Sequence, residues 1–321
     1  MRTLRPLTIL LCLAAAVLAL LACGGSGDGT ETIAPLTDST TAADQPAQGG
    51  GGGSKGSGSG GGGEEQGVPD SSKLSAELDA LGERIGSQVG ATIGAPGAPP
   101  YVLGSLQSGS AWSTIKVPIA LQVIDEAGGV DELTSAQRAD ITAAITQSDN
   151  EAAARLFDIL VSNHGSVEAA SQALTDLLRE AGDEETVVST EPRGEYSSYG
   201  QTEWSLQAQQ TFMGALLNGC IGDAGGRDFV LTKMSEVVVE SWGLAAAGVP
   251  ALWKGGWGPG VEDGYLVRQM GKINVDGTDY AVTIAAIADD GSFEGGQAAT
   301  TEVAKWLVDH APKDAGEPGG C

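Results

Sequence analysis

Residues 112–127 read WSTIKVPIALQVIDEA, and this stretch decides the fold. The apolar pattern from Thr114 to Ala127 predicts a buried helix that ends at the glycine pair that follows it. Ser113 and Lys116 are three residues apart, so their side chains share one helix face. A lysine that is partly desolvated beside other cations loses its proton near neutral pH and activates a serine. A serine near a helix start with a solvated lysine would give the same short pattern, so this motif alone is not specific.

Two further motifs carry residues suited to acyl transfer. In Ser148-Asp149-Asn150, the Ser148 hydroxyl would relay a proton to a leaving group and Asn150 would contact the substrate or Lys116. The same three residues would also serve as the cap of a helix over 150–162. In Lys254-Gly255-Gly256-Trp257, Lys254 would place a cation beside Ser148, unless it is an exposed lysine at the end of a glycine-rich strand.

Composition excludes several classes of protein. The 321 residues contain 17 Lys and Arg against 42 Asp and Glu, a formal charge of −25, which argues against a nucleic-acid partner. A hydrophobic content of 41% argues against wholesale disorder. The only histidines are His164 and His310, which leaves little room for a histidine-ligated metal or a Ser-His-Asp triad. We therefore expect no metal and no cofactor, and proton transfer by Lys, Ser, Asp or Glu.

The N-terminal segment predicts export and membrane attachment. Arg2 and Arg5 precede an apolar run from Leu7 to Ala22, as in a secretory signal. The run ends in Leu-Leu-Ala before Cys23 and resembles a bacterial lipobox, which implies cleavage after residue 22 and lipid attachment to Cys23. The alternative is an ordinary signal peptide with an incidental cysteine. The lipobox predicts a protein anchored to the extracytoplasmic face of the cell membrane.

The rest of the chain divides by composition. Residues 23–70 are rich in Gly and Ser and predict a flexible linker. Residues 71–312 have the composition of one globular domain, and 313–321 form a Pro/Gly-rich tail. In an exported protein Cys220 and Cys321 could form a disulfide, but the position of Cys321 in the tail leaves this pairing open.

Hydrophobic periodicity predicts an α+β domain. Helices are expected over Leu74–Val89, 135–147, 150–162, 166–181, 205–218 and 294–310, in addition to the helix after Ser113. A hairpin is expected over Ala91–Gly104, and strands over Ala251–Lys254, Tyr265–Val275 and Tyr280–Ala288. Strands near both ends with helices between them predict one antiparallel sheet of N- and C-terminal strands, flanked by helices, with a helical subdomain from the middle of the chain.

The three motifs occur in the order Ser-x-x-Lys, Ser-Asp-Asn, Lys-x-Gly, which resembles the penicillin-recognising serine hydrolases and most nearly the class A β-lactamases. The resemblance extends over most of residues 73–312, with similar sequence around Ser148 and on the approach to Lys254. It implies that Ser113 is the nucleophile, Lys116 its activating partner, Ser148 the proton shuttle and Lys254 the cation beside it.

The same resemblance assigns the substrate contacts. Asn150 would bind the substrate or Lys116. The oxyanion hole would consist of the backbone N–H groups of Ser113 and Trp257, with Gly256 in the adjoining strand. Substrates of this family are β-lactams or peptidoglycan stem peptides, and the same chemistry serves esters.

Three departures from the family pattern limit what the resemblance implies. Ser113 and Ser148 are closer in the chain than in class A enzymes, and Gly255 replaces the usual Thr or Ser hydroxyl. Arg268 could then bind the substrate carboxylate, or be a solvated strand-edge arginine. Glu191 could be the base that releases the acyl group, or an exposed loop carboxylate.

These departures leave two alternatives to a hydrolase. One is a catalytically degenerate member that binds peptidoglycan peptides or a cell-envelope partner without turnover. The other is a tethered adaptor that uses the fold only for interaction. The presence of the motif serine and of both lysines favours the enzyme.

Overall fold

The computed structural model describes residues 71–260, 264–313 and 318–321. The predicted signal peptide 1–22, the lipid anchor Cys23 and the linker 23–70 lie outside these residues. None of the helices within the described residues is long and apolar enough to cross a membrane.

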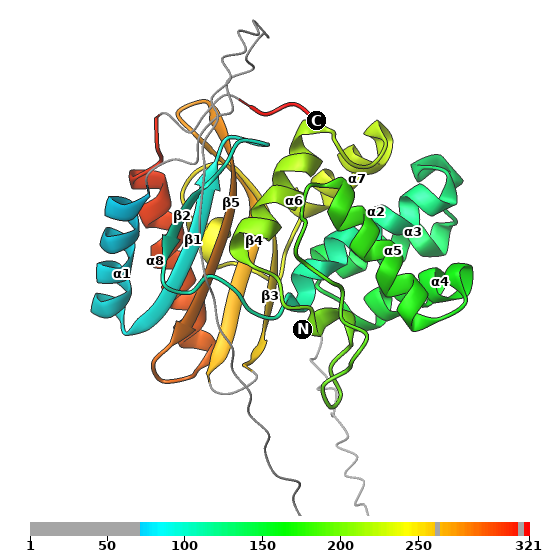
Figure 1. Cartoon of the computed structure of the whole chain (residues 1–321), viewed down its shortest axis with the longest axis horizontal. Helices are drawn as coiled ribbons and strands as arrows, with labels where there is room; N and C mark the ends of the chain where they lie inside the picture. The colour runs from blue at the N-terminus through cyan, green and yellow to red at the C-terminus, as the bar shows by residue number, and fades with distance from the viewer. Residues whose placement is uncertain (1–70, 261–263, 314–317) are drawn as a thin grey trace, which may run out of the picture. The chain divides into compact units, whose positions relative to one another are not determined.

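One five-stranded antiparallel sheet organises the domain (Figure 1). Its strands are β1 (Ser87–Gly94), β2 (Tyr101–Gly104), β3 (Ala251–Pro259), β4 (Tyr265–Val275) and β5 (Thr278–Ala288), in the order β2-β1-β5-β4-β3. Strand β1 pairs with β5 along its whole length, from Ser87 opposite Ala288 to Gly94 opposite Ala281. The predicted sheet of N- and C-terminal strands is therefore confirmed.

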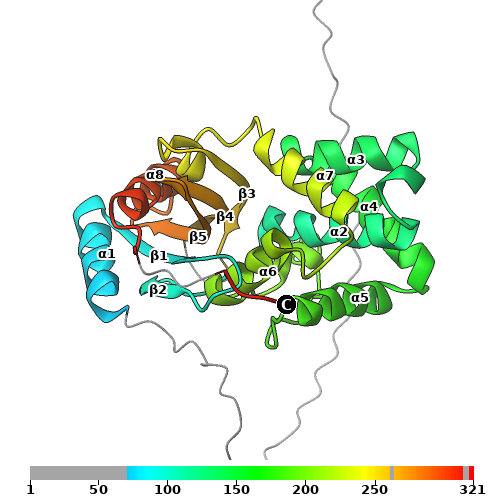
Figure 2. The same ribbon diagram turned by 90° about the horizontal axis from the view of Figure 1, so that it is seen from above.

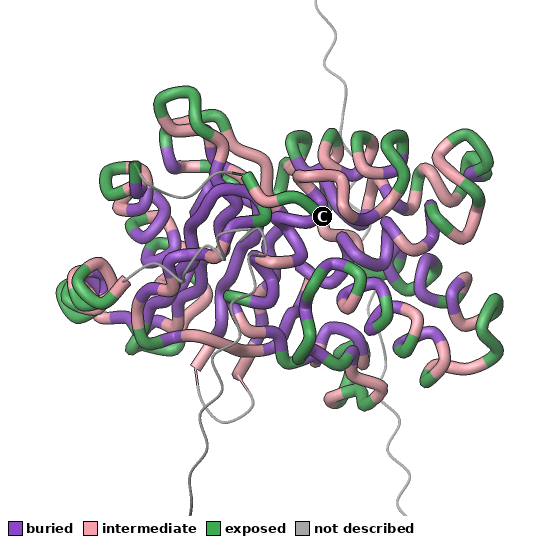
Figure 3. Tube along the Cα trace, turned by 45° about the horizontal axis from the view of Figure 1, so that its top comes forward, coloured by how far each residue is buried: buried purple, intermediate pink, exposed green. Residues whose placement is uncertain are grey.

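The helices form three groups around the sheet. Figure 2 shows α1 (Ser72–Ile85) and α8 (Phe293–Asp309) on one face, and α6 (Leu206–Asn218) on the other. Beyond α6 lies the helical subdomain of α2 (Lys116–Ala127), α3 (Ser135–Thr146), α4 (Asn150–His164), α5 (Val167–Glu180) and α7 (Ala224–Ser235). The strands and the inner faces of the helices are buried, as Figure 3 shows. The α+β prediction and its helical subdomain are confirmed.

The predicted set of elements needs two corrections. The expected helix over Leu74–Val89 was too long, because Gly86 takes the left-handed conformation (φ 63°) and the chain turns there into β1. Helix α7 was not predicted, since its first turn contains Gly225 and Gly226, which have low helix propensity. The Asp223 side chain compensates by accepting hydrogen bonds from both glycine N–H groups.

The C-terminal residues are attached to the domain. Cys220 and Cys321 form a disulfide with their Cα atoms 5.2 Å apart, which resolves the pairing left open by the sequence. Next to it, Asn218 Nδ2 donates hydrogen bonds to the carbonyl oxygens of Pro96 (2.7 Å) and Gly319 (2.8 Å). The last residues of the chain are thereby held against the start of the β1–β2 connection.

Candidate active site

Ser113 lies in a short 3₁₀ helix, Trp112–Ile115, that leads directly into α2. The chain enters this turn through Trp112, which has the left-handed φ of 49° that is uncommon for a residue with a side chain. Lys116 is the first residue of α2 and is only 2% exposed. Ser113 and Lys116, three positions apart on this helical turn, both line the cavity.

The loop between α3 and α4 brings the second motif to Lys116. Lys116 Nζ donates hydrogen bonds to the Ser148 carbonyl oxygen at 2.6 Å and to Asn150 Oδ1 at 2.7 Å. Ser148 has a positive φ of 55°. Asp149 caps α4 by accepting a hydrogen bond from the Ala152 N–H at 2.9 Å. The helix-capping interpretation is therefore confirmed for Asp149, and Asn150 contacts Lys116, one of the two partners predicted for it. The proton-relay role of Ser148 stays a prediction.

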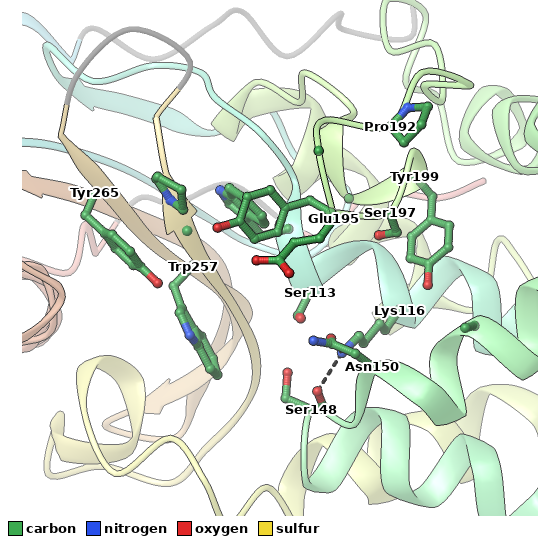
Figure 4. A pocket seen from close by; sticks show the side chains of 17 residues that line it. Ser113, Lys116, Ser148, Asn150, Pro192, Glu195, Ser197, Tyr199, Trp257 and Tyr265 are labelled. Atoms are coloured by element: carbon green, nitrogen blue, oxygen red, sulfur yellow. Dashed lines mark hydrogen bonds between the residues drawn. The ribbon is translucent and has the colours of Figure 1, made fainter. Parts of the chain in front are cut away.

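Strand β3 brings in the third motif. Lys254 Nζ donates to Ser148 Oγ at 3.0 Å, to Glu240 Oε1 at 2.7 Å and to the Gly255 carbonyl oxygen at 2.8 Å. Three segments far apart in the sequence therefore form one hydrogen-bonded group. In Figure 4 the side chains of Ser113, Ser148 and Asn150 converge on the same pocket.

Gly256 allows β3 to approach the turn that carries Ser113. A Cβ atom at residue 256 would lie 2.8 Å from the Ser113 backbone nitrogen and 2.7 Å from the Ala111 carbonyl oxygen, closer than real Cβ contacts. Only glycine fits this position without displacing the strand. The close approach sets the backbone beside Trp257 next to that of Ser113, an arrangement compatible with the predicted oxyanion hole.

The environment of Lys116 favours its neutral form. Burial, and next to it the positive charge of Lys254, lower the pKa of Lys116 from 10.5 to about 7, although Asp149 and Glu240 oppose the shift. A lysine with this pKa is deprotonated in a substantial fraction of molecules at neutral pH. It is therefore suited to act as a general base toward a neighbouring hydroxyl.

The cavity has a volume of about 580 Å³. Of the predicted site residues, Ser113, Lys116, Ser148, Asn150 and Trp257 line it. Lys254 and Gly256 do not; both are buried behind its surface. Half of the remaining lining residues are aromatic or proline: Trp112, Pro192, Tyr196, Tyr199, Pro259 and Tyr265.

A loop carboxylate lines this cavity, but it is not Glu191. Glu191 is exposed and lies outside the cavity lining, which agrees with the second interpretation of that residue. Glu195 lines the cavity instead, at a tight turn in which Arg193 and Tyr196 exchange backbone hydrogen bonds. The sequence contains no signal that distinguishes Glu195 from Glu191, because the direction of each side chain depends on this turn.

Arg268 has neither of the two roles considered for it. Its side chain is fully buried under the sheet and donates to the carbonyl oxygens of Gly109 (2.7 Å) and Trp204 (3.0 Å) and to Gln209 Oε1 (2.9 Å). It is neither a ligand at the cavity nor a solvated edge residue. Arg268 instead joins β4 to the segments that lead to the 3₁₀ turn and to α6.

Glu240 is a second residue at the site that sequence reasoning missed. It lies in the connection between α7 and β3 and forms an ion pair with Lys254 in which both side chains are 0% exposed. A side chain at residue 255 would collide with this carboxylate, so Glu240 occupies the space beside Gly255. No local pattern marks Glu240, since only the fold brings it to β3.

No protein-family model and no curated protein matches the chain by sequence. Solved structures do match it. A β-lactamase from Chitinophaga pinensis has a TM-score of 0.59 at 15% identity, over 76% of this chain and 100% of that one. The TLA-1 extended-spectrum β-lactamase has a TM-score of 0.62 at 13% identity, over 76% of this chain and 99% of that one. PBP-A has a TM-score of 0.56 at 19% identity, over 75% of this chain and 96% of that one.

The fold is that of the class A β-lactamases and PBP-A. The predicted resemblance is thereby confirmed at the level of the fold. Identities of 13–20% do not transfer an activity, so the roles of the individual residues remain predictions.

Proposed function

We propose that this protein is an active-site-serine hydrolase that is acylated on Ser113, exported, and anchored to the membrane by lipid on Cys23. The observation that carries the enzymatic part is the hydrogen-bonded group of Lys116, Ser148 and Lys254 beside the Ser113 turn. A binding module would not require a buried lysine whose pKa is lowered to about 7. The anchor rests on the sequence around Cys23 alone.

The proposed reaction begins with neutral Lys116. Lys116 takes the proton from Ser113 Oγ, and this oxygen forms a bond to the substrate carbonyl carbon. The backbone N–H groups of Ser113 and Trp257 stabilise the resulting oxyanion. The bond to the leaving group then breaks, and the leaving atom takes a proton from Ser148, which regains one from Lys116. Asn150 and the ion-paired Lys254 hold Lys116 and Ser148 in position.

Water completes the cycle by attacking the acyl group on Ser113. Glu195 is the carboxylate that lines the cavity and is the candidate base for this step. The candidate substrates are β-lactams, peptidoglycan stem peptides and esters. One observation favours β-lactams: a PBP-A variant with the same fold has been solved as an acyl-enzyme complex with penicillin G.

Intact mass spectrometry tests the proposal. The purified protein is incubated with a fluorescent penicillin and, separately, with an uncharged fluorophosphonate, beside a Ser113→Ala control. If either reagent forms an adduct of one equivalent with the wild type and none with Ser113→Ala, Ser113 is supported as the nucleophile. Consumption of penicillin without an adduct, again only in the wild type, supports β-lactamase turnover. Absence of both adduct and turnover would refute the hydrolase and favour a binding role.

A further inference from the structure

The charge on Lys254 is already neutralised inside the protein. Its ammonium group has three N–H bonds, and three acceptors surround it: Glu240 Oε1, Ser148 Oγ and the Gly255 carbonyl oxygen. The ion pair with Glu240 is fully buried. A carboxylate on a substrate would therefore find no free N–H at this lysine, and it would meet the Glu240 carboxylate beside it.

Glu240 is held firmly in that position. Gln269 Nε2 donates to Glu240 Oε2 at 3.3 Å, and Gln269 itself is anchored on β4 and bonded to the Leu244 N–H through its oxygen at 2.7 Å. Because Gly255 has no side chain, the Glu240 carboxylate fills the room next to β3. The negatively charged Glu240 carboxylate thus lies where the family pattern predicts the hydroxyl group of a Thr or Ser at residue 255.

Among the described residues no arginine side chain lines the cavity, and Arg193 lies against the rings of Trp112 and Tyr196 at 5.4 and 5.5 Å from their centroids. Arg268 is buried and committed to carbonyl and amide oxygens. Arg193 donates to Gln201 Oε1 and to the carbonyl oxygens of Pro259 and Gly260. Among the described residues, the one Lys or Arg side chain that lines the cavity is Lys116, while Glu195 adds a carboxylate.

The cavity wall next to β3 suits uncharged groups. Trp257 stacks on Phe293 with ring centroids 5.5 Å apart, and Tyr265 contacts Phe293 at the same separation. On the opposite side, Trp112 and Tyr196 meet edge to face at 5.0 Å. These rings provide broad apolar contact surfaces on both sides of the serine.

From these observations we infer that Ser113 acts on esters or amides with an uncharged leaving group, and that Glu240 sets this specificity by neutralising Lys254. The inference rests on the proposed function and narrows its substrate class, away from β-lactams and peptides with a carboxylate beside the scissile bond. The reaction is unchanged: the Ser113 Oγ–carbon bond forms, the bond to the leaving oxygen or nitrogen breaks, and that atom receives a proton.

A matched pair of substrates tests the inference. The phenylacetyl esters of 3-hydroxybenzamide and 3-hydroxybenzoate differ only in an amide against a carboxylate on the leaving phenol. Phenol release gives kcat/KM for each at pH 7.5. We expect the wild type to prefer the amide by at least tenfold, and Glu240→Gln, which leaves Lys254 with a net charge, to lower that preference by at least tenfold. The control Glu236→Gln removes an exposed carboxylate four positions earlier in the chain, which pairs with Lys233, and is expected to leave the ratio unchanged.

The outcomes separate the inference from the proposed function. If the wild type reacts equally well or better with the carboxylate ester, the specificity inference is overturned while the serine hydrolase stands. An unchanged ratio in a folded Glu240→Gln protein would overturn the role of Glu240. If neither ester nor the fluorophosphonate reacts at Ser113, both proposals fall. Should Glu240→Gln not fold, the wild-type ratio alone decides the substrate class.

Discussion

Replacing Lys116 with methionine tests how the fold and the chemistry are coupled at one residue. The fall of the Lys116 pKa from 10.5 to about 7 means that the folded protein disfavours the ammonium form. Below pH 7 the lysine is protonated in both states, and its burial costs up to about 5 kcal/mol of folding free energy. Between pH 7 and 10.5 the unfolded chain binds more protons than the folded one, so the free energy of unfolding rises with pH over this window.

Lys116→Met removes this cost together with two hydrogen bonds. The carbonyl oxygen of Ser148 and Oδ1 of Asn150 lose a donor, at about 1–3 kcal/mol for each acceptor that stays buried. The variant should therefore be more stable than the wild type by up to about 3 kcal/mol at pH 6, the value reached when each acceptor costs about 1 kcal/mol. Its advantage should shrink by about 1.4 kcal/mol per pH unit above 7, since only the wild type gains stability there. It should not be acylated at all.

Urea unfolding of both proteins at half-unit intervals from pH 6 to 9.5 measures this difference, and intact mass measures acylation. Lys305→Met is the control, because that lysine is exposed on α8 and should leave the pH dependence unchanged. A stability difference that stays flat from pH 6 to 9.5 would refute the lowered pKa. Acylation that persists in Lys116→Met would refute the role of the lysine as base.

Further predictions concern other parts of the chain. In Gly256→Ala the new methyl group collides with the Ser113 backbone nitrogen, so we expect acylation to slow at least tenfold in a fluorophosphonate time course, and a wild-type rate would contradict the close approach. Cys220→Ser opens a disulfide between residues separated by 101 positions and should lower the free energy of unfolding by about 2–5 kcal/mol in urea; dithiothreitol should then have no further effect. Cys23→Ala should move the protein from the detergent to the aqueous phase on partitioning, and unchanged partitioning would argue against the lipid anchor. Glu195→Gln should prolong the acyl-enzyme in a mass-spectrometric chase, whereas Glu191→Gln should not.

The features that sequence reasoning found depend on short-range geometry. The i, i+3 spacing of Ser113 and Lys116 brings both to one side of a helical turn in any context. The helix cap at Asp149 fixes Asn150 in the same local way. The β4–β5 hairpin follows from Asp276, which takes a left-handed φ of 51°, and Gly277. Such elements could be predicted because neighbouring residues alone determine them.

The features that it missed depend on long-range packing. Glu240 contacts Lys254 only because the connection after α7 passes beside Lys254 and Gly255 in β3. Both interpretations of Arg268, as a substrate partner and as a solvated strand-edge residue, were wrong because β4 lies between β5 and β3 and the side chain is buried. Glu195 and Glu191 differ in direction, and that difference arises from one turn. The hydrophobic periodicity and the composition of the sequence contain no information about these contacts.

The pairing of β1 with β5 has a consequence for biogenesis. Thr92 and Thr283 share a 2.6 Å hydrogen bond across these strands although 191 positions separate them. During synthesis, the hydrogen-bonding edge of β1 that faces β5 has no partner until the last strand emerges. The sheet therefore forms late, after almost the whole domain has left the ribosome. A chain truncated before residue 278 would retain the helical subdomain and Ser113, but it would lack the central strand on which the whole sheet is assembled.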